Sequence, residues 1–204
     1  MAATAVTNTV DIAPIAITSG AARAADTVTA DATAPELVTG GFELNLDGAS
    51  PTLTLTFDEP IRAATGFTVT GVAIEQAAGG GGAAVVLSSD SSTASLDGSR
   101  SIVIDLGPND VDAIKIQTLV AVSDVTTHLH LDANAVRDMN NVGSAAVTGP
   151  LISILTADFT ADATPPTLDS FTLDMNAATA QLVLTFSEPI QATSVFDVTE
   201  IEIQ

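Results

Sequence analysis

The amino-acid sequence predicts an all-β protein, namely a β-sandwich that carries one short helix. Valine, isoleucine and leucine alternate with threonine and serine over much of the chain, which is typical of strands that bury one face. Turn-forming glycine, proline and aspartate recur about every 8 to 12 residues, a spacing that favours short strands packed as a sandwich. The 204 residues are 46% hydrophobic, which is enough apolar material for a packed core.

The first expected element is a β-hairpin around the turn sequence DGASP. Leu44 and Leu46 alternate with polar residues before this turn, and Leu53, Leu55 and Phe57 alternate with threonine after it. Because alternate side chains of a strand point to opposite faces, this hairpin has one apolar face.

The next expected elements are short strands. They cover residues 67–74 and 84–88, with the tetraglycine Gly79–Gly82 as a flexible loop between them. A second hairpin is expected from residues 92–96 and 101–106, because Asp-Gly between two alternating runs is a strong hairpin signal.

One segment, GPNDVDAIKIQTLV, departs from strand spacing. Asn109 or Asp110 is expected to cap a short helix there, which turns Val111, Ile114 and Leu119 inward. The following segment, THLHLDANAVRD, returns to strand spacing.

Two histidines lie on that last strand. His128 and His130 are two residues apart, so both rings point to the same face. They form either a two-point metal site, with Asp124 and Asp132 as the nearest further ligands, or a pair of exposed strand histidines.

The chain contains an internal repeat. The segment from Asp31 to Ile61 is matched by the segment from Asp162 to Ile190, and Phe42 to Phe57 align with Phe171 to Phe186 without a gap. Residues 3–18 align in the same way with residues 133–148. We therefore expect three parts: the C-terminal part of a preceding repeat (1–30), a complete repeat (31–161) and the N-terminal part of a following repeat (162–204).

These residues carry a resemblance to a known family. The pattern DATPPTLDSFTLDMN…LVLTFSEPI, together with NDVDAIK and AVRDMNN, resembles immunoglobulin-like (Ig-like) repeats found in tandem in very large surface or secreted proteins of marine microbes. The Phe-Ser-Glu-Pro strand end after a proline-rich linker is more loosely similar to bacterial Ig-like adhesin modules. The resemblance covers almost the whole chain. It implies Ig-like sandwiches in a tandem array, an extracellular or cell-surface location and no catalysis.

The composition argues against several classes of function. With 25 acidic and 5 basic residues the net charge is -20, which repels nucleic acid and anionic membranes and attracts divalent cations. The chain has no cysteine, no run of 18 apolar residues and no recognisable catalytic motif. We therefore expect neither membrane insertion nor enzymatic activity.

Calcium at the repeat junctions is the expected cofactor. Calcium takes about six to eight oxygen ligands, and each junction supplies spaced aspartates and a Glu-Pro strand end. The alternative is that these residues only form turns and linkers, because no Asp-x-Asp-x-Asp-Gly loop is present. The candidate ligands are Asp26, Asp31, Glu59, Asp158, Asp162 and Glu188.

Two functions follow from this organisation. The first is a structural repeat module of a long extracellular stalk, sheath or filament, whose partners are neighbouring repeats of the same or identical chains. The alternative is an adhesin-type module that binds a glycan or a protein through its loops, although a chain without tryptophan or tyrosine lacks the usual aromatic platform for sugars.

Overall fold

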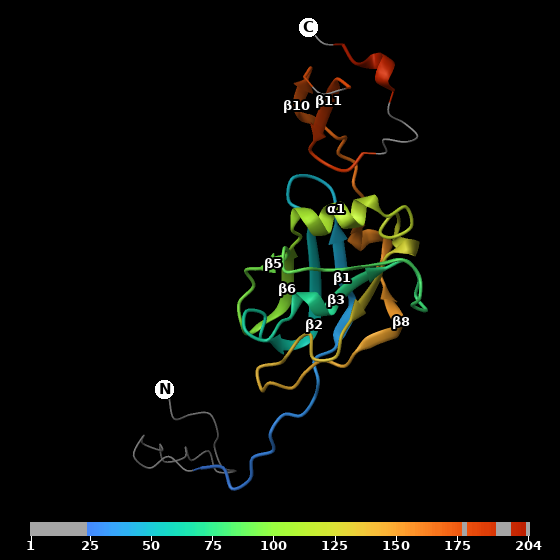
Figure 1. The fold of residues 1–204 in the computed structure, drawn as a ribbon. Coiled ribbons are helices and arrows are strands. Elements are labelled where there is room, and N and C mark those ends of the chain that lie inside the picture. Colours follow the sequence, from blue (N-terminus) through green and yellow to red (C-terminus); the bar gives the residue numbers. More distant parts are fainter. Residues whose placement is uncertain (1–23, 177–178, 191–196, 203–204) are drawn as a thin grey trace, which may run out of the picture. The chain divides into compact units, whose positions relative to one another are not determined.

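The computed structural model describes residues 24–176, 179–190 and 197–202 of the chain. The chain divides into two compact units, residues 1–31 and residues 32–204. In the first unit, the described residues 24–31 contain no helix or strand. The second unit contains a sandwich and a separate hairpin (Figure 1).

The larger sheet of the sandwich has five strands in the order β5-β6-β2-β1-β9. All of its pairs are antiparallel except β9, which runs parallel to β1. The strands are β1 (Leu37–Asn45), β2 (Thr52–Ile61), β5 (Ser92–Thr93), β6 (Ser99–Asp105) and β9 (Phe159–Thr160).

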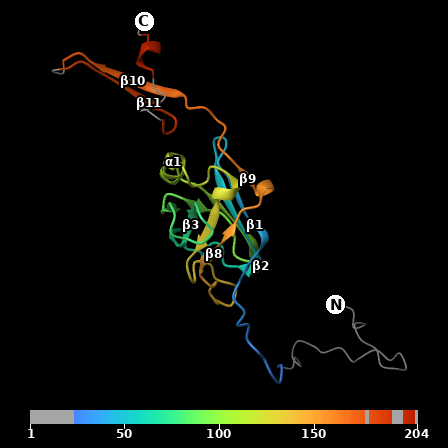
Figure 2. The ribbon, with the colours of Figure 1, turned by 90° about the vertical axis from the view of Figure 1, so that its right-hand side faces the viewer.

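The smaller sheet has four antiparallel strands in the order β4-β3-β7-β8. Figure 2 shows β1 and β2 in one layer and β3 and β8 in the other. One α-helix, α1 (Pro108–Ile116), follows β6. The strands are β3 (Val72–Glu75), β4 (Ala84–Val86), β7 (His128–Leu131) and β8 (Val147–Ser153), and short 3-10 turns cover Val69–Gly71, Asp124–Thr126, Thr156–Asp158 and Val198–Glu200.

The core lies between the two sheets, and strand alternation produces it. In β2, Leu53, Leu55 and Phe57 are buried, while the threonines between them are only partly buried. They share one apolar cluster with Ile74 of β3 and Leu129 of β7. Burying a side chain of this size stabilises the fold by about 1.5–3 kcal/mol. The predicted all-β sandwich with one short helix is confirmed, and the tandem array stays a prediction.

Four predicted strands are shorter than expected. Of these, β4 ends at Val86 and β5 at Thr93, before the predicted ends at residues 88 and 96. Of residues 67–74 only Val72 onward lies in the sheet, because Thr68 N–H donates to Ala135 O (2.8 Å) and ties the preceding turn to a loop. Of THLHLDANAVRD only His128–Leu131 is a strand. The sequence analysis did not predict β8 or β9.

Helix α1 forms where it was predicted, but it is capped differently. Its N-cap is Gly107, followed by Pro108 at the first helical position, and neither Asn109 nor Asp110 caps it. Val111 and Ile114 are buried as expected, whereas Leu119 lies beyond the helix and is 50% exposed. Within the described part of the chain, no helix has the length and apolarity needed to cross a bilayer.

A second hairpin, β10 (Leu168–Asp174) and β11 (Gln181–Phe186), follows the sandwich. Its pairs repeat the register of β1 and β2, since Phe171 faces Leu184 as Phe42 faces Leu55. The burial differs completely, because Phe42 is 2% exposed and Phe171 is 57% exposed. The hairpin therefore presents to solvent the apolar face that the sandwich buries.

The two hairpins differ at a bulge in β1. Between its pairings at Leu37 and Phe42, β1 advances by five residues while β2 advances by two. Between Leu168 and Phe171, β10 advances by three residues while β11 also advances by two. The bulge contains Gly40 and Gly41. Gly40 has a φ of +71°, and a Cβ on Gly41 would lie 2.5 Å from Thr56 O, so both positions favour glycine.

Candidate functional site

Lys115 connects the sandwich to the hairpin that follows it. It lies in the last turn of α1, where a cation also complements the helix dipole. Its Nζ is 3.0 Å from Asp162 Oδ2 in the linker and 2.7 Å from Glu188 Oε2 after β11. The Lys115 side chain is 15% exposed and that of Glu188 is 10% exposed, so water screens this pair only partly.

Burial and the two acidic partners together determine the pKa of Lys115. Burial lowers its pKa, but hydrogen bonds to Glu188 and then to Asp162 outweigh that effect, and the pKa is raised above its ordinary value of 10.5. As long as the two carboxylates are ionised, the ion pairs therefore keep their full contribution up to about pH 10.5. Their contribution is lost only as the pH rises through the raised pKa.

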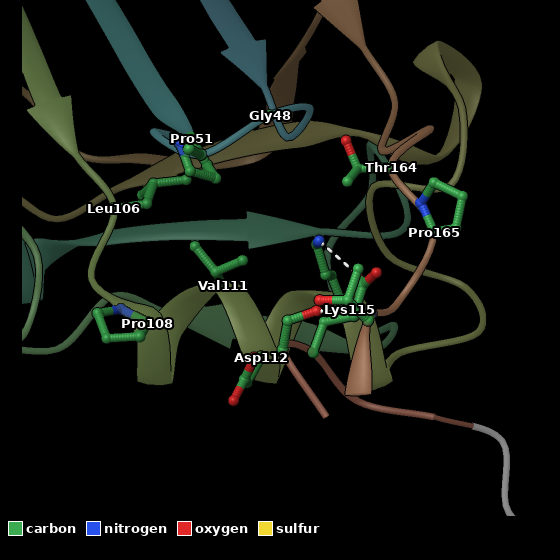
Figure 3. A pocket seen from close by; sticks show the side chains of 13 residues that line it. Gly48, Pro51, Leu106, Pro108, Val111, Asp112, Lys115, Thr164 and Pro165 are labelled. Carbon is green, nitrogen blue, oxygen red and sulfur yellow. Dashed lines mark hydrogen bonds and ion pairs between the residues drawn. The ribbon is translucent and has the colours of Figure 1, made fainter. Parts of the chain in front are cut away.

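A groove of about 550 Å³ lies beside this junction. Figure 3 shows Val111 and Lys115 on α1 along one part of it, and Thr164 and Pro165 of the linker along another. Pro51 and Leu106 add apolar surface. The groove is thus formed jointly by the sandwich, by the linker and by residues that follow β11.

The linker is also held by Asp47, in the turn after β1. Asp47 Oδ1 accepts hydrogen bonds from Thr164 Oγ1 (2.8 Å) and from the Ala163 amide (3.2 Å). The bond from Thr164 and then that from Ala163 hold the pKa of Asp47 below its ordinary value. Because β9 pairs with β1 just before this point, the linker leaves the sandwich next to the Asp47 turn.

A second acidic group lies at the end of β2. Carboxylate oxygens of Glu59 and Asp138 lie within 4.8 Å of each other. Ile61 pairs with Asp138 across an isolated bridge, and the Arg62 amide donates to Arg137 O (2.8 Å), so the two segments are fixed side by side.

Asp138 is the buried member of this group, with 0% of its surface exposed. Its Oδ1 accepts a hydrogen bond from the Val142 amide (2.6 Å), while its Oδ2 is buried and accepts none. Two charges about 5 Å apart repel by on the order of 3 kcal/mol at an effective dielectric constant of about 20. Asp138 and Glu59 thus form an arrangement that a cation would stabilise.

Of the six predicted ligands, the structure brings Asp162 and Glu188 together, around the ammonium group of Lys115. Asp31 belongs to the first unit of the chain and Glu59 to the second. Asp26 is exposed in the first unit. Asp158 lies in the 3-10 turn before β9, where its amide donates to Leu155 O (2.9 Å).

Three site residues escaped the sequence analysis, namely Lys115, Asp47 and Asp138. Lys115 lies in the motif NDVDAIK and Asp138 in the motif AVRDMNN, but these motifs did not predict the contacts of either residue. Their roles depend on contacts between residues far apart in the sequence. The repeat alignment was the signal that could have directed attention to them, because it pairs Asp31 with Asp162 and Glu59 with Glu188.

The prediction of exposed histidines is wrong for His128, which is 6% exposed because β7 lies inside its sheet between β3 and β8. His130 Nε2 is 3.2 Å from Asp132 Oδ1, and its Nδ1 is 3.1 Å from Glu75 Oε1 but outside hydrogen-bond geometry. Among the described residues, neither histidine belongs to a close group of three potential metal ligands.

Both acidic groups are suited to binding cations. One already holds the ammonium group of Lys115, and the other places the carboxylates of Glu59 and Asp138 close together. Comparisons of the chain with protein-family models, with curated proteins and with solved structures found no match.

Proposed function

We propose that the sandwich is the repeat unit of an extracellular structural array, a stalk, sheath or filament, and that its partners are neighbouring repeats. The observation that carries this proposal is the second hairpin. Its pairs from Phe171 to Asp174 repeat those from Phe42 to Asn45 of the first hairpin, and it leaves exposed the face that the first one buries. A hairpin of this kind gains stability when the rest of a sandwich covers it.

The contacts at the junction support a mechanical role. Helix α1 of one unit reaches the linker and the hairpin of the next through Lys115, while Asp47 holds Thr164. Such nearest-neighbour contacts limit bending between successive units in a repeat protein. Calcium at the junctions would add to this stiffness, and the extracellular location belongs to the proposal as well.

A chain extended by one further part-repeat tests the proposal. Gln204 aligns with Glu75, so residues 76–161 appended after Gln204 complete a second repeat. We expect the backbone amides of β10 and β11 to become as protected from hydrogen exchange as those of β1 and β2. If they exchange as fast in the extended chain as in the 204-residue chain, the hairpin is not the start of a repeat.

Replacing Lys115 with Gln is expected to loosen the junction without unfolding the sandwich. The change leaves Asp162 and the poorly exposed Glu188 without their cation, which costs on the order of 1–2 kcal/mol at a partly solvated site. We expect proteolysis within linker residues 161–167 to be several-fold faster.

The control for that change is Arg100→Gln, which removes one positive charge from an exposed position on β6. It should leave the cleavage rate in the linker unchanged. Equal rates for Lys115→Gln and the unaltered protein would show that the ion pairs do not hold the junction.

The adhesin alternative stays a prediction. The groove at Lys115 lies against the linker and is lined by residues from both sides of it, which fits a joint between units. Specific, saturable binding of a glycan by the protein would favour the adhesin function instead.

A further inference from the structure

The ammonium group of Lys115 can bind one acceptor more than the two it contacts. A lysine ammonium group has three N–H donors. Two of them are matched by Asp162 Oδ2 at 3.0 Å and Glu188 Oε2 at 2.7 Å. The Lys115 side chain is only 15% exposed, so a protein acceptor suits the third donor better than bulk water does.

The complete repeat shows which residue lies beside the counterpart of Glu188. The repeat alignment equates Glu188 with Glu59, which lies in β2. A carboxylate oxygen of Asp138 lies within 4.8 Å of one of Glu59. The isolated bridge between Ile61 and Asp138 keeps the aspartate next to the end of β2. A complete following repeat would therefore bring its own residue at the position of Asp138 next to Glu188.

Asp138 is a carboxylate that requires a positive partner. It is fully buried, and its Oδ1 accepts a hydrogen bond from the Val142 amide (2.6 Å). Its Oδ2 is also buried but receives no hydrogen bond. A buried carboxylate oxygen without a donor is costly, and the negative charge of Glu59 nearby adds repulsion. A cation that contacts both carboxylates removes both costs.

The separation of these two carboxylates suits an ammonium group. Hydrogen bonds from an ammonium nitrogen to a carboxylate are about 2.7–2.9 Å long, so one nitrogen bridges oxygens up to roughly 5.5 Å apart. The oxygens of Glu59 and Asp138 lie within that span. At the equivalent glutamate, Glu188, a lysine nitrogen already lies 2.7 Å from the carboxylate.

We propose that Glu59 and Asp138 bind the ammonium group of the lysine that a preceding repeat carries at the position of Lys115. In the same way, Glu188 and the Asp138 position of a following repeat bind Lys115 itself. This inference rests on the proposed repeat array, and it identifies a lysine as the cation between these two acids. Because Asn8 aligns with Asp138, repeats differ at this position, and a repeat with aspartate forms the tighter junction.

The chain extended by residues 76–161 after Gln204 tests the inference, because the appended segment supplies the Asp138 position of a second repeat. A double-mutant cycle combines Lys115→Gln with Asp138→Asn in the appended segment. Cleavage within linker residues 161–167, by a protease that needs no calcium, is the measurement. We expect Asp138→Asn to speed cleavage at least about threefold when Lys115 is present, and by less than about 1.5-fold in the Lys115→Gln background.

The matched control is Asp105→Asn in the appended segment, since Asp105 is an exposed acid at the end of β6. It should leave the cleavage rate unchanged in both backgrounds. Hydrogen exchange of β10 and β11 reports whether the second repeat of each variant is folded. If Asp138→Asn prevents folding, a crystal structure of the unaltered extended chain takes its place. In that structure the appended Asp138 carboxylate should lie within about 4 Å of Lys115 Nζ.

The outcomes separate this inference from the proposed function. Protected β10 and β11 amides, together with an equal effect of Asp138→Asn in both Lys115 backgrounds, would overturn the lysine site and leave the array standing. A larger distance in the crystal structure would do the same. Unprotected amides in the unaltered extended chain would contradict the array and the lysine site together. Millimolar calcium should not slow cleavage, and slowing that Asp138→Asn abolishes would assign the two acids to the metal instead.

Discussion

Replacing Phe42 with Ala is expected to lower the free energy of unfolding by about 3–5 kcal/mol, whereas Phe171→Ala should change it by less than about 1 kcal/mol. The two residues hold the same position in hairpins of the same register. Phe42 is 2% exposed in the core between the sheets, and Phe171 is 57% exposed. Truncating Phe42 leaves a cavity, while truncating Phe171 mainly removes surface that is already in water.

Urea denaturation followed by circular dichroism measures both changes, because a chain without tryptophan or tyrosine offers little intrinsic fluorescence. The comparison also bears on the repeat. In the chain extended by residues 76–161, the cost of Phe171→Ala should rise to that of Phe42→Ala. A cost that stays small in the extended chain would mean that Phe171 never enters a core.

The hairpins were predictable because their information is local. Alternation of Leu53 and Leu55 with threonine fixes which face is apolar, and a one-residue slip would expose it. Strand β8 could not be found in this way. It contains Gly149 and Pro150, which interrupt any strand pattern, and it exists because Leu129 and Leu131 of β7 supply its pairing partners.

The candidate sites show the same difference between what is local in the sequence and what depends on long-range contacts. The repeat alignment was enough to mark Asp31, Glu59, Asp162 and Glu188 as related residues. It did not show that Lys115 binds Asp162 and Glu188 or that Asp138 lies near Glu59, since both contacts depend on how α1 and the turn after residue 137 pack. A sequence repeat thus predicts which positions are equivalent, and the fold decides what each copy contacts.

The start of α1 is a further case in which tertiary contacts override a local signal. Asn109 does not cap the helix. Instead its own amide donates to Asp90 Oδ2 (2.9 Å), a carboxylate from a preceding loop. Gly107 allows this approach, because a Cβ there would lie 2.3 Å from the same oxygen. The loop before β5 therefore supplies the negative charge that the helix N-terminus favours.

Asp110 fixes that loop from the other side, and Asp110→Ala is expected to destabilise the protein by about 2–4 kcal/mol. Its carboxylate is 4% exposed and accepts hydrogen bonds from the Ser88 amide (3.0 and 3.1 Å) and from Ser91 Oγ (2.6 Å). Ser91 Oγ in turn accepts from the Gly107 amide (3.0 Å). Removing the carboxylate leaves the buried Ser91 hydroxyl and the partly buried Ser88 amide without this acceptor, which costs more than the bonds contribute.

The control is Asp112→Ala, which removes an acid two residues further along the same helix. Asp112 is half-buried at the groove, and the change should cost less than about 1 kcal/mol. Urea denaturation of both variants, with hydrogen exchange at the Ser88 amide, separates the two cases. Faster exchange at Ser88 is expected for Asp110→Ala alone, because only that change removes its acceptor. Equal costs for the two variants would show that the helix tolerates the loss of either acid and that the Ser88–Ser91 loop is held by other contacts.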